Sequence, residues 1–251
     1  MLEVCIDSYE SAKNAVIGGA QRLEVCSALS EGGLTPSMGL VNIIRKFLNV
    51  TVYVMIRIRS GNYIYSREEM DAMLFDLKNF KEAKLADGFV FGALTNCREI
   101  DICYCKEIIS AAFPLPVTFH RAFDEINNPL EGIEILQSIH FRRILSSGQK
   151  DTAEKGIELL EMMCSKVKEY MPSKIVIIPC CGITPENILF IKSKTKATEF
   201  HSSARKKREL GENERNRVRI GSAVTEENFV MVTDSETVRK MINIINVTDN
   251  A

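Results

Sequence analysis

The sequence predicts an α/β fold in which eight parallel strands close into a single-domain (β/α)8 barrel of the TIM type. Three observations support this. Eight apolar, strand-like runs recur along the 251 residues, helix signals fill the stretches between them, and the strand starts lie roughly 20–37 residues apart, which is the length of one strand-helix unit. A doubly wound open sheet is the alternative. Its strands usually read as continuous apolar runs, whereas several strands here alternate apolar with charged residues.

The elements follow one another in the order that a barrel requires. Helix signals fill the gaps between strands: Ser8 precedes an amphipathic stretch that stops at Gly18-Gly19, and Ser66 opens a Ser-x-x-Glu capping box. Three prolines stand where first helical turns are expected, at positions 36, 129 and 185. The strands are expected at 2–6, 22–26, 51–58, 88–92, 116–120, 142–146, 174–179 and 198–202.

The region after the eighth strand departs from the simple repeat. Residues 205–219 are rich in both signs of charge, and we interpret them as a solvated loop, with a basic lip that helps to hold an anion as the alternative. A helix-start signal at 233–236 then opens an apolar-periodic helix over about 235–247. We expect one domain over residues 1–251.

Composition limits the partners. The chain is 45% hydrophobic and 26% charged with a net charge of −1, so no global field attracts nucleic acid or a membrane surface. There is no apolar run of transmembrane length. No signal-type segment precedes the first predicted strand, and eight cysteines are scattered along the chain. We therefore expect reduced thiols and a cytoplasmic protein.

Alternation along the strands predicts a polar barrel interior. The tetrapeptide Leu-Glu-Val-Cys occurs at 2–5 and again at 23–26, and a strand exposes alternate residues to opposite faces. The leucines and valines are expected to face the helices, and the glutamates and cysteines to face inward. The same alternation in other strands gives an interior that holds Glu3, Glu24, Glu199, Arg57, His120 and His201. A structural barrel would fill these layers with Val, Ile and Leu, so this interior indicates a functional site.

One chemistry that fits is metal binding. Cys5 and Cys26 occupy the same place in the two copies of the repeat, on strands expected to be neighbours about 4.8 Å apart. Two thiolates at that separation suit one soft ion such as Cu(I). The alternative reading of the two residues is a pair of buried small hydrophobes.

The other chemistry is binding of a small anionic ligand. Four arginines near strand ends offer forked donors for carboxylate or phosphate, and Ser147 and Gly148 after the sixth strand offer backbone donors. A histidine, His120 or His201, paired with Glu24 would then serve acid-base catalysis. The four arginines are Arg57, Arg59, Arg121 and Arg205. A structural interaction barrel without a ligand is a third possibility, but it leaves the charged interior unexplained.

Segments at the strand ends resemble the CutC copper-homeostasis family. They cover the chain from the first strand to the eighth. The most specific are the segments at 116–124 and 199–205. The segments are SALSEGGLTPS at 27–37, VMIRIRSGNYIYS at 54–66, DGFVFGALT at 87–95, PVTFHRAFD at 116–124, RILSSG at 143–148 and EFHSSAR at 199–205.

The resemblance implies a TIM-type barrel, a cytosolic homo-oligomer and a role in copper handling, with Cys5 and Cys26 as copper ligands. Asp124 and Ser202 fall within the matching segments and are expected to line the adjoining pocket. The polar mouth of such barrels also looks like an enzyme site. One departure stands out: family members usually carry a run of glycines after the seventh strand, whereas here Cys180 and Cys181 precede Gly182.

Overall fold

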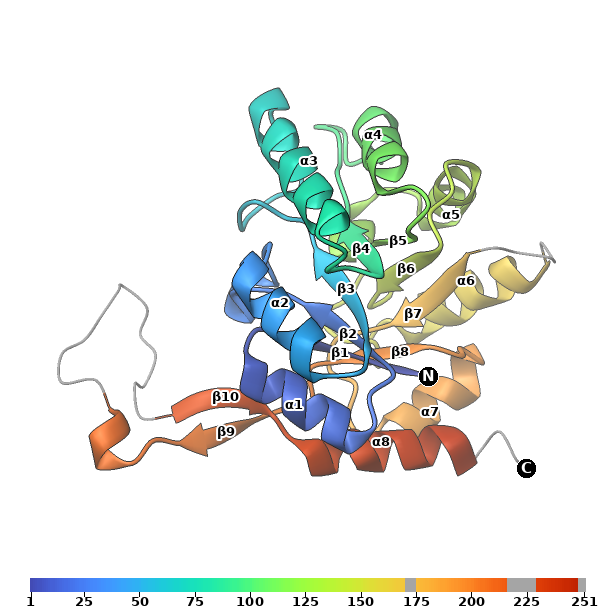
Figure 1. Cartoon of the computed structure of the whole chain (residues 1–251). Coiled ribbons are helices and arrows are strands. Elements are labelled where there is room, and N and C mark those ends of the chain that lie inside the picture. Colours follow the sequence, from blue (N-terminus) through green and yellow to red (C-terminus); the bar gives the residue numbers. More distant parts are fainter. Residues whose placement is uncertain (170–174, 216–228, 248–251) are drawn as a thin grey trace.

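The computed structural model describes residues 1–169, 175–215 and 229–247, and its central feature is a nearly closed parallel barrel (Figure 1). The strands are hydrogen-bonded in the order β7-β6-β5-β4-β3-β2-β1-β8, which confirms the predicted fold class. Between β7 and β8 the described residues form no ladder, and the Ser202 hydroxyl instead donates to the Ile183 carbonyl at 2.8 Å. The strands are β1 (Leu2–Ile6), β2 (Arg22–Val25), β3 (Thr51–Met55), β4 (Gly88–Phe91), β5 (Val117–Phe119), β6 (Arg143–Ser146), β7 (Val176–Pro179) and β8 (Phe200–Ser202).

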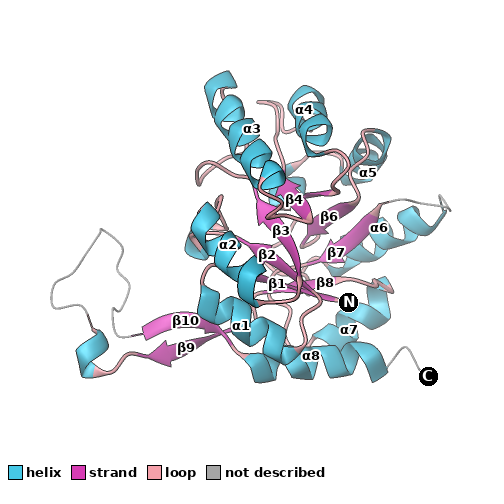
Figure 2. Cartoon of the chain, in the orientation of Figure 1, coloured by secondary structure: helices cyan, strands magenta, loops and turns pink. Residues whose placement is uncertain are grey.

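Helices wrap the outside of the strands (Figure 2). They are α1 (Tyr9–Gly18), α2 (Met38–Phe47), α3 (Arg67–Glu82), α4 (Ile102–Ala112), α5 (Pro129–Ser138), α6 (Ile157–Glu169), α7 (Ile188–Thr195) and α8 (Ser235–Val247). Short 3-10 turns lie in the loops, namely η1 (Leu29–Glu31), η2 (Arg121–Glu125) and η3 (Glu212–Glu214). Within the described ranges, no helix is long and apolar enough to cross a membrane.

Helix starts follow local capping chemistry. The Ser8 side chain caps α1, Ser66 and Glu69 form the predicted capping box of α3, and Pro129 is the first residue of α5. The prolines at 36 and 185 do not lie in first helical turns, because both helices begin later than predicted. Pro36 precedes the N-cap of α2, where the Ser37 hydroxyl accepts the Leu40 amide. Residues 185–187 form a turn before α7.

The core has two layers, as strand alternation predicts. Leu2, Val4, Leu23 and Val25 are fully buried in the large cluster between strands and helices. A smaller apolar cluster fills the barrel interior and consists of Cys26, Tyr53, Met55, Val90, Leu145, Ile178 and Cys180. The remaining interior positions are polar, and they form the site.

A two-stranded hairpin interrupts the last strand-helix unit. Strand β9 (Arg205–Glu209) pairs antiparallel with β10 (Phe229–Thr233), and the hairpin projects from the barrel beside α1 (Figure 1). The loop predicted from residue 205 is therefore wrong over β9. Its five charged residues give no β-pattern of their own, and the strand depends on a partner twenty residues away. Residues 216–219 of that predicted loop lie outside the described residues.

Candidate functional site

A cavity of about 600 Å³ opens at the carboxyl ends of the strands, where barrels of this type carry their sites. Eight of the residues predicted from the sequence line it, and five do not. Those that line the cavity are Cys5, Glu24, Arg57, His120, Arg121, His201, Ser202 and Arg205. Those absent from its lining are Cys26, Arg59, Asp124, Ser147 and Gly148.

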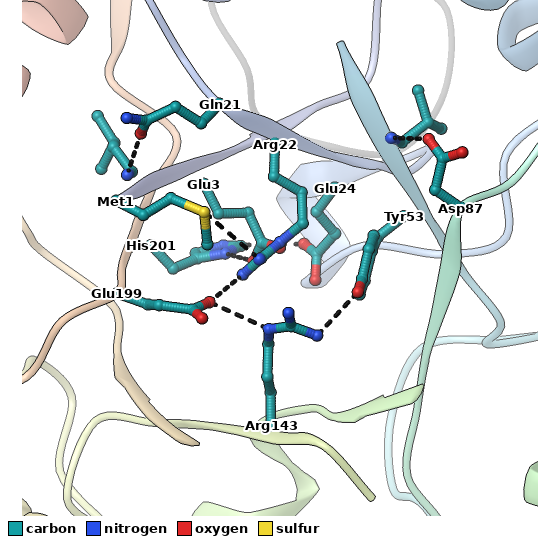
Figure 3. A network of polar contacts seen from close by, with 12 residues as sticks. Met1, Glu3, Gln21, Arg22, Glu24, Tyr53, Asp87, Arg143, Glu199 and His201 are labelled. Atoms are coloured by element: carbon teal, nitrogen blue, oxygen red, sulfur yellow. Dashed lines mark hydrogen bonds and ion pairs between the residues drawn. The ribbon is translucent and has the colours of Figure 1, made fainter. Parts of the chain in front are cut away.

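An ionic network of buried and half-buried residues lies in the barrel interior (Figure 3). Arg22 is paired with Glu3 on one side and with Glu199, at 2.6 Å, on the other. Arg143 donates to Glu199 at 3.0 Å and to the Tyr53 hydroxyl at 2.8 Å. Burial acts to raise the pKa of Glu3, but Arg22 and His201 outweigh it and hold that pKa at about 2. The network therefore keeps Glu3 ionised directly below the site.

Three chemically different ligand groups converge on the cavity floor. The ligand atoms of Cys5, Glu24 and His201 lie within 4.8 Å of one another, and all three residues are buried. His201 Nδ1 lies 2.7 Å from a Glu3 carboxylate oxygen, and His201 Nε2 lies 3.7 Å from Glu24 Oε2. Glu3 thus fixes the ring so that Nε2 faces the cluster.

Burial and mutual attraction set the protonation of this cluster. Burial raises the pKa of Glu24 to about 7 and raises the pKa of the Cys5 thiol above its ordinary value. Burial opposes charge on His201 as well, but Cys5, Glu24 and Glu3 more than compensate and raise its pKa well above 6.5. Near neutral pH the cluster therefore holds protons that a bound cation would displace.

Cys26 is not level with Cys5. Across the β1–β2 ladder Cys5 pairs with Glu24 and Ile6 with Val25, so Cys26 lies two residues farther along. The equal placement expected from the repeat is wrong, because strands of a barrel are staggered relative to one another. Cys26 is fully buried with its Sγ 3.5 Å from Glu24 Oε2, and it is absent from the cavity lining.

His120 and Arg57 present unpaired donors near the cavity. His120 Nδ1 accepts the Ala122 amide at 3.1 Å, so the neutral ring carries its proton on Nε2. Burial, together with Arg57, lowers the pKa of His120 to about 3. Three Arg57 donors reach the carbonyls of Glu31, Gly33 and Gly61. His120 Nε2 and Arg57 Nε are buried and have no hydrogen-bond partner among the described residues.

Asp124, Ser147 and Gly148 build the loop beside the cavity instead of lining it. Asp124 accepts the Ser147 amide at 3.0 Å and the Arg121 guanidinium at 3.0 Å, and Arg121 also donates to the Ser147 hydroxyl at 3.0 Å. Gly148 has φ of 70°, a conformation that favours glycine. These contacts leave Arg121 held in place at the cavity wall.

The two remaining predicted arginines are both engaged in ion pairs. Arg59 binds Glu69 at 2.5 Å and the Ile64 carbonyl at 2.7 Å, which fixes the loop before α3 outside the cavity lining. Arg205 lines the cavity and pairs with Asp7 at 3.1 Å.

Cys180 and Cys181 form a pair of neighbouring thiols in the cavity wall. Their Sγ atoms are 3.9 Å apart, and Cys181 has φ of 70° in the position where a glycine run was expected. Contact with the Cys180 thiol, aided by Arg121, lowers the pKa of Cys181 to about 7 although burial opposes it. Both residues line the cavity.

Some site residues escaped the sequence analysis. Arg22 stands two residues before Glu24 on the same strand, so alternation puts both side chains on the same, inward face. That signal could have identified Arg22. Arg143 lies at the start of β6, where the inward face is apparent only from the pairing of β6 with its neighbours. Lys206 and Lys240 also line the cavity, and they reach it from the hairpin and from α8. Lys206 belongs to the charged stretch 205–219, for which a basic lip was the alternative interpretation, whereas no local pattern indicates the placement of Lys240.

Fold and site together define a class: a parallel (β/α)8 barrel with a buried thiol, imidazole and carboxylate converging below a polar cavity. The CutC family model matches residues 1–206, and the chain belongs to the CutC family. The human copper homeostasis protein cutC homolog is 43% identical over 245 residues, which cover 96% of this chain and 87% of the human protein. The Caenorhabditis elegans homolog is 43% identical over 204 residues, covering 81% of this chain and 80% of that protein.

Solved structures agree with this assignment. A crystal structure of a CutC protein from Streptococcus agalactiae superposes with a TM-score of 0.74 at 29% identity, covering 81% of this chain and 98% of that chain. Thiamine phosphate pyrophosphorylase from Pyrococcus furiosus superposes with a TM-score of 0.55 at 14% identity, covering 98% of this chain and 95% of that chain. At that identity the second structure shares the fold alone.

Proposed function

We propose that this copper-homeostasis family member binds copper as Cu(I) on the cavity floor, through Cys5 and His201 with Glu24 beside them. The observation that carries the proposal is the convergence of these three ligand atoms within 4.8 Å on one cavity. Thiolate and imidazole are ligands that suit Cu(I). The printed names of the human and C. elegans relatives, which refer to copper homeostasis, point the same way.

The carboxylate behind His201 strengthens the proposal. A ligating histidine usually donates its other ring N–H to a carboxylate, which fixes the tautomer and makes the ligand more basic. Glu3 is placed for this role, 2.7 Å from His201 Nδ1. Arg22 in turn keeps Glu3 ionised, so the barrel interior supports the ligand from behind.

The pair of ligands predicted from the sequence, Cys5 with Cys26, is the competing set. Cys26 contacts Glu24 and does not line the cavity. Cys5 and His201 both line the cavity, so we favour these two and assign Cys26 a secondary part.

The test is an anaerobic Cu(I) competition titration against a chelator of known affinity. Cys5→Ser and His201→Gln should each weaken binding more than about 100-fold, because loss of outer-shell partners alone costs 10–100-fold. Cys26→Ser should weaken it less than about tenfold. Cys103→Ser, which changes an exposed thiol, is the matched control. Unchanged affinity in Cys5→Ser would refute the proposed site.

A second candidate function is an enzyme that acts on a small phosphorylated or carboxylated metabolite. It is favoured by the two unpaired buried donors, His120 Nε2 and Arg57 Nε, and by a cavity volume typical of small-molecule sites. Neutral His120 would donate a hydrogen bond to a ligand oxygen, and Glu24 with its pKa near 7 would move a proton.

Anion binding is tested by thermal unfolding with a panel of phosphate and carboxylate compounds. A ligand of this site should raise the melting temperature of the wild type but not of His120→Ala. The Cu(I) affinity of His120→Ala should stay within about threefold of wild type, since His120 is not among the copper ligands proposed. The absence of any shift across the panel would remove this candidate.

The proposal includes a cytoplasmic location and a homo-oligomer. All eight cysteines are free thiols in the structure, which suits a reducing compartment. Large apolar side chains such as Phe75 and Phe113 are more than 60% exposed and would suit contacts between copies. Light scattering that gives a mass of 28.2 kDa, that of one chain, would exclude the oligomer.

A further inference from the structure

Cys180 and Cys181 are geometrically suited to hold an ion between them. Their Sγ atoms are 3.9 Å apart. With metal–sulfur distances of about 2.3 Å, this separation gives an S–metal–S angle of about 115°, between tetrahedral and trigonal values. Both thiols line the cavity, and neither belongs to the group formed by Cys5, Glu24 and His201.

Oxidation to a disulfide fits these two residues less well. Ordinary disulfides join Cα atoms 4.4–6.8 Å apart, whereas the Cα atoms of adjacent residues are about 3.8 Å apart across a trans peptide. The sulfurs would also have to approach to about 2.05 Å. A bridging ion needs no such movement.

The surroundings favour a thiolate at Cys181, whereas the contact with Cys181 and burial raise the pKa of the Cys180 thiol, whose proton a bound cation would displace. Arg121 is held at the cavity wall by Asp124 and Ser147, and its positive charge stabilises the Cys181 thiolate. Two thiolates around one monovalent cation carry a net charge of −1, and Arg121, which is also paired with Asp124, interacts favourably with that charge. The Cys181 carbonyl accepts the Ala153 amide at 3.0 Å and so holds the backbone in its left-handed conformation.

We propose that Cys180 and Cys181 form a second, bidentate thiolate site for a soft, thiophilic cation in the cavity wall. The identity of the cation as Cu(I) rests on the proposed function, whereas the ligand pair does not. Wild-type protein is then expected to take up two Cu(I) ions per chain, one at each site.

The experiment counts Cu(I) ions per chain under anaerobic conditions at a fixed chelator concentration. Wild type, Cys180→Ser, Cys181→Gly and Cys5→Ser are compared, with the exposed-thiol variant Cys103→Ser as the control. Cys181→Gly is informative because glycine accepts the φ of 70°, so this variant is expected to keep its fold and melting temperature. Two ions are expected for wild type and control, and one for each of the other three variants.

A second probe is independent of copper. An organic trivalent arsenical oxide forms two arsenic–sulfur bonds with a dithiol, while the two thiol protons leave with its oxygen as water and no electron is transferred. One arsenical per wild-type chain is expected, with loss of binding in both Cys180→Ser and Cys181→Gly and retention in Cys5→Ser.

The outcomes separate the two sites. If Cys180→Ser and Cys181→Gly bind as many Cu(I) ions and as much arsenical as wild type, the dithiol site is refuted. If Cys5→Ser binds as many Cu(I) ions as wild type while Cys180→Ser and Cys181→Gly bind fewer, the floor site is refuted and the dithiol site is supported. If Cys181→Gly loses one ion but keeps its melting temperature, the loss comes from the ligand and the dithiol site is supported.

Discussion

At the residue scale, Glu24 is a buried carboxylate whose ionisation destabilises the folded state. It is 4% exposed, its Oε1 atom has no hydrogen-bond partner among the described residues, and burial raises its pKa from 4.5 to about 7. Because the folded state holds the proton more tightly than the unfolded state, stability is lost as pH rises from about 4.5 to about 7. This loss of stability is what we expect at a position that is kept for a ligand.

Glu24→Gln should therefore stabilise the protein above pH 7. The gap between 4.5 and about 7 corresponds to about 3 kcal/mol at pH 8, and the gain should vanish near pH 4.5, where wild-type Glu24 is protonated in the folded state. Urea unfolding of both proteins at pH 5 and pH 8 measures this. An equal difference at the two pH values would contradict the raised pKa.

Residue patterns alone predicted much of this interior. Alternation correctly predicted that Glu3, Glu24 and His201 face inward. It could not predict that Glu24 rather than Cys26 stands opposite Cys5, because that register depends on the stagger of the closed barrel. Nor could it predict which inward polar groups are satisfied by each other and which remain free for a ligand.

At the element scale, the loop from β6 to α6 shapes the cavity wall behind Arg121. Two glycines cross at its base: a Cβ on Gly156 would lie 2.0 Å from the Ser147 carbonyl oxygen, and one on Gly148 would lie 2.2 Å from the Gly156 oxygen. Both contacts are with backbone, which cannot rotate away. This crossing positions Ser147, which in turn binds Arg121 and Asp124.

Gly156→Ala should accordingly lower the free energy of unfolding by about 1–3 kcal/mol, the usual cost of overpacking. Denaturant unfolding provides the measurement. Gly39→Ala in α2, where the nearest atom to a new Cβ is the Ser37 hydroxyl at 4.0 Å, is the matched control and should be neutral or slightly stabilising. Equal effects of the two substitutions would show that the backbone crossing is not the constraint.

Elements differed in how far sequence could predict them. Strands β1 to β8 each contain a local apolar run, and several of them alternate apolar with charged residues. Helices α1, α3 and α5 begin at side-chain caps or a proline that can be recognised from the local sequence. Strand β9 has no such local signal, since its residues are charged and its partner β10 is distant. The hairpin was for that reason not predicted, although the alternative of a basic lip over residues 205–219 included Lys206.

At the scale of the whole molecule, barrel closure brings the first and the eighth strand side by side around one polar interior. The Phe200 amide donates to the Met1 carbonyl at 3.0 Å, and His201 beside it binds Glu3 of the first strand. Glu199 then links Arg22 of β2 to Arg143 of β6 across the barrel. The candidate copper ligands Cys5 and His201 are 196 positions apart and meet only because the barrel closes.

The most direct measurement is copper K-edge X-ray absorption on the Cu(I)-loaded Cys181→Gly variant, in which the floor site is the one left intact. We predict a first coordination shell that contains one sulfur together with nitrogen. Cys26→Ser should leave this shell unchanged, and His201→Gln should remove the nitrogen. A shell of two sulfurs that loses one in Cys26→Ser would contradict the ligand set proposed here and would assign the ion to Cys5 and Cys26.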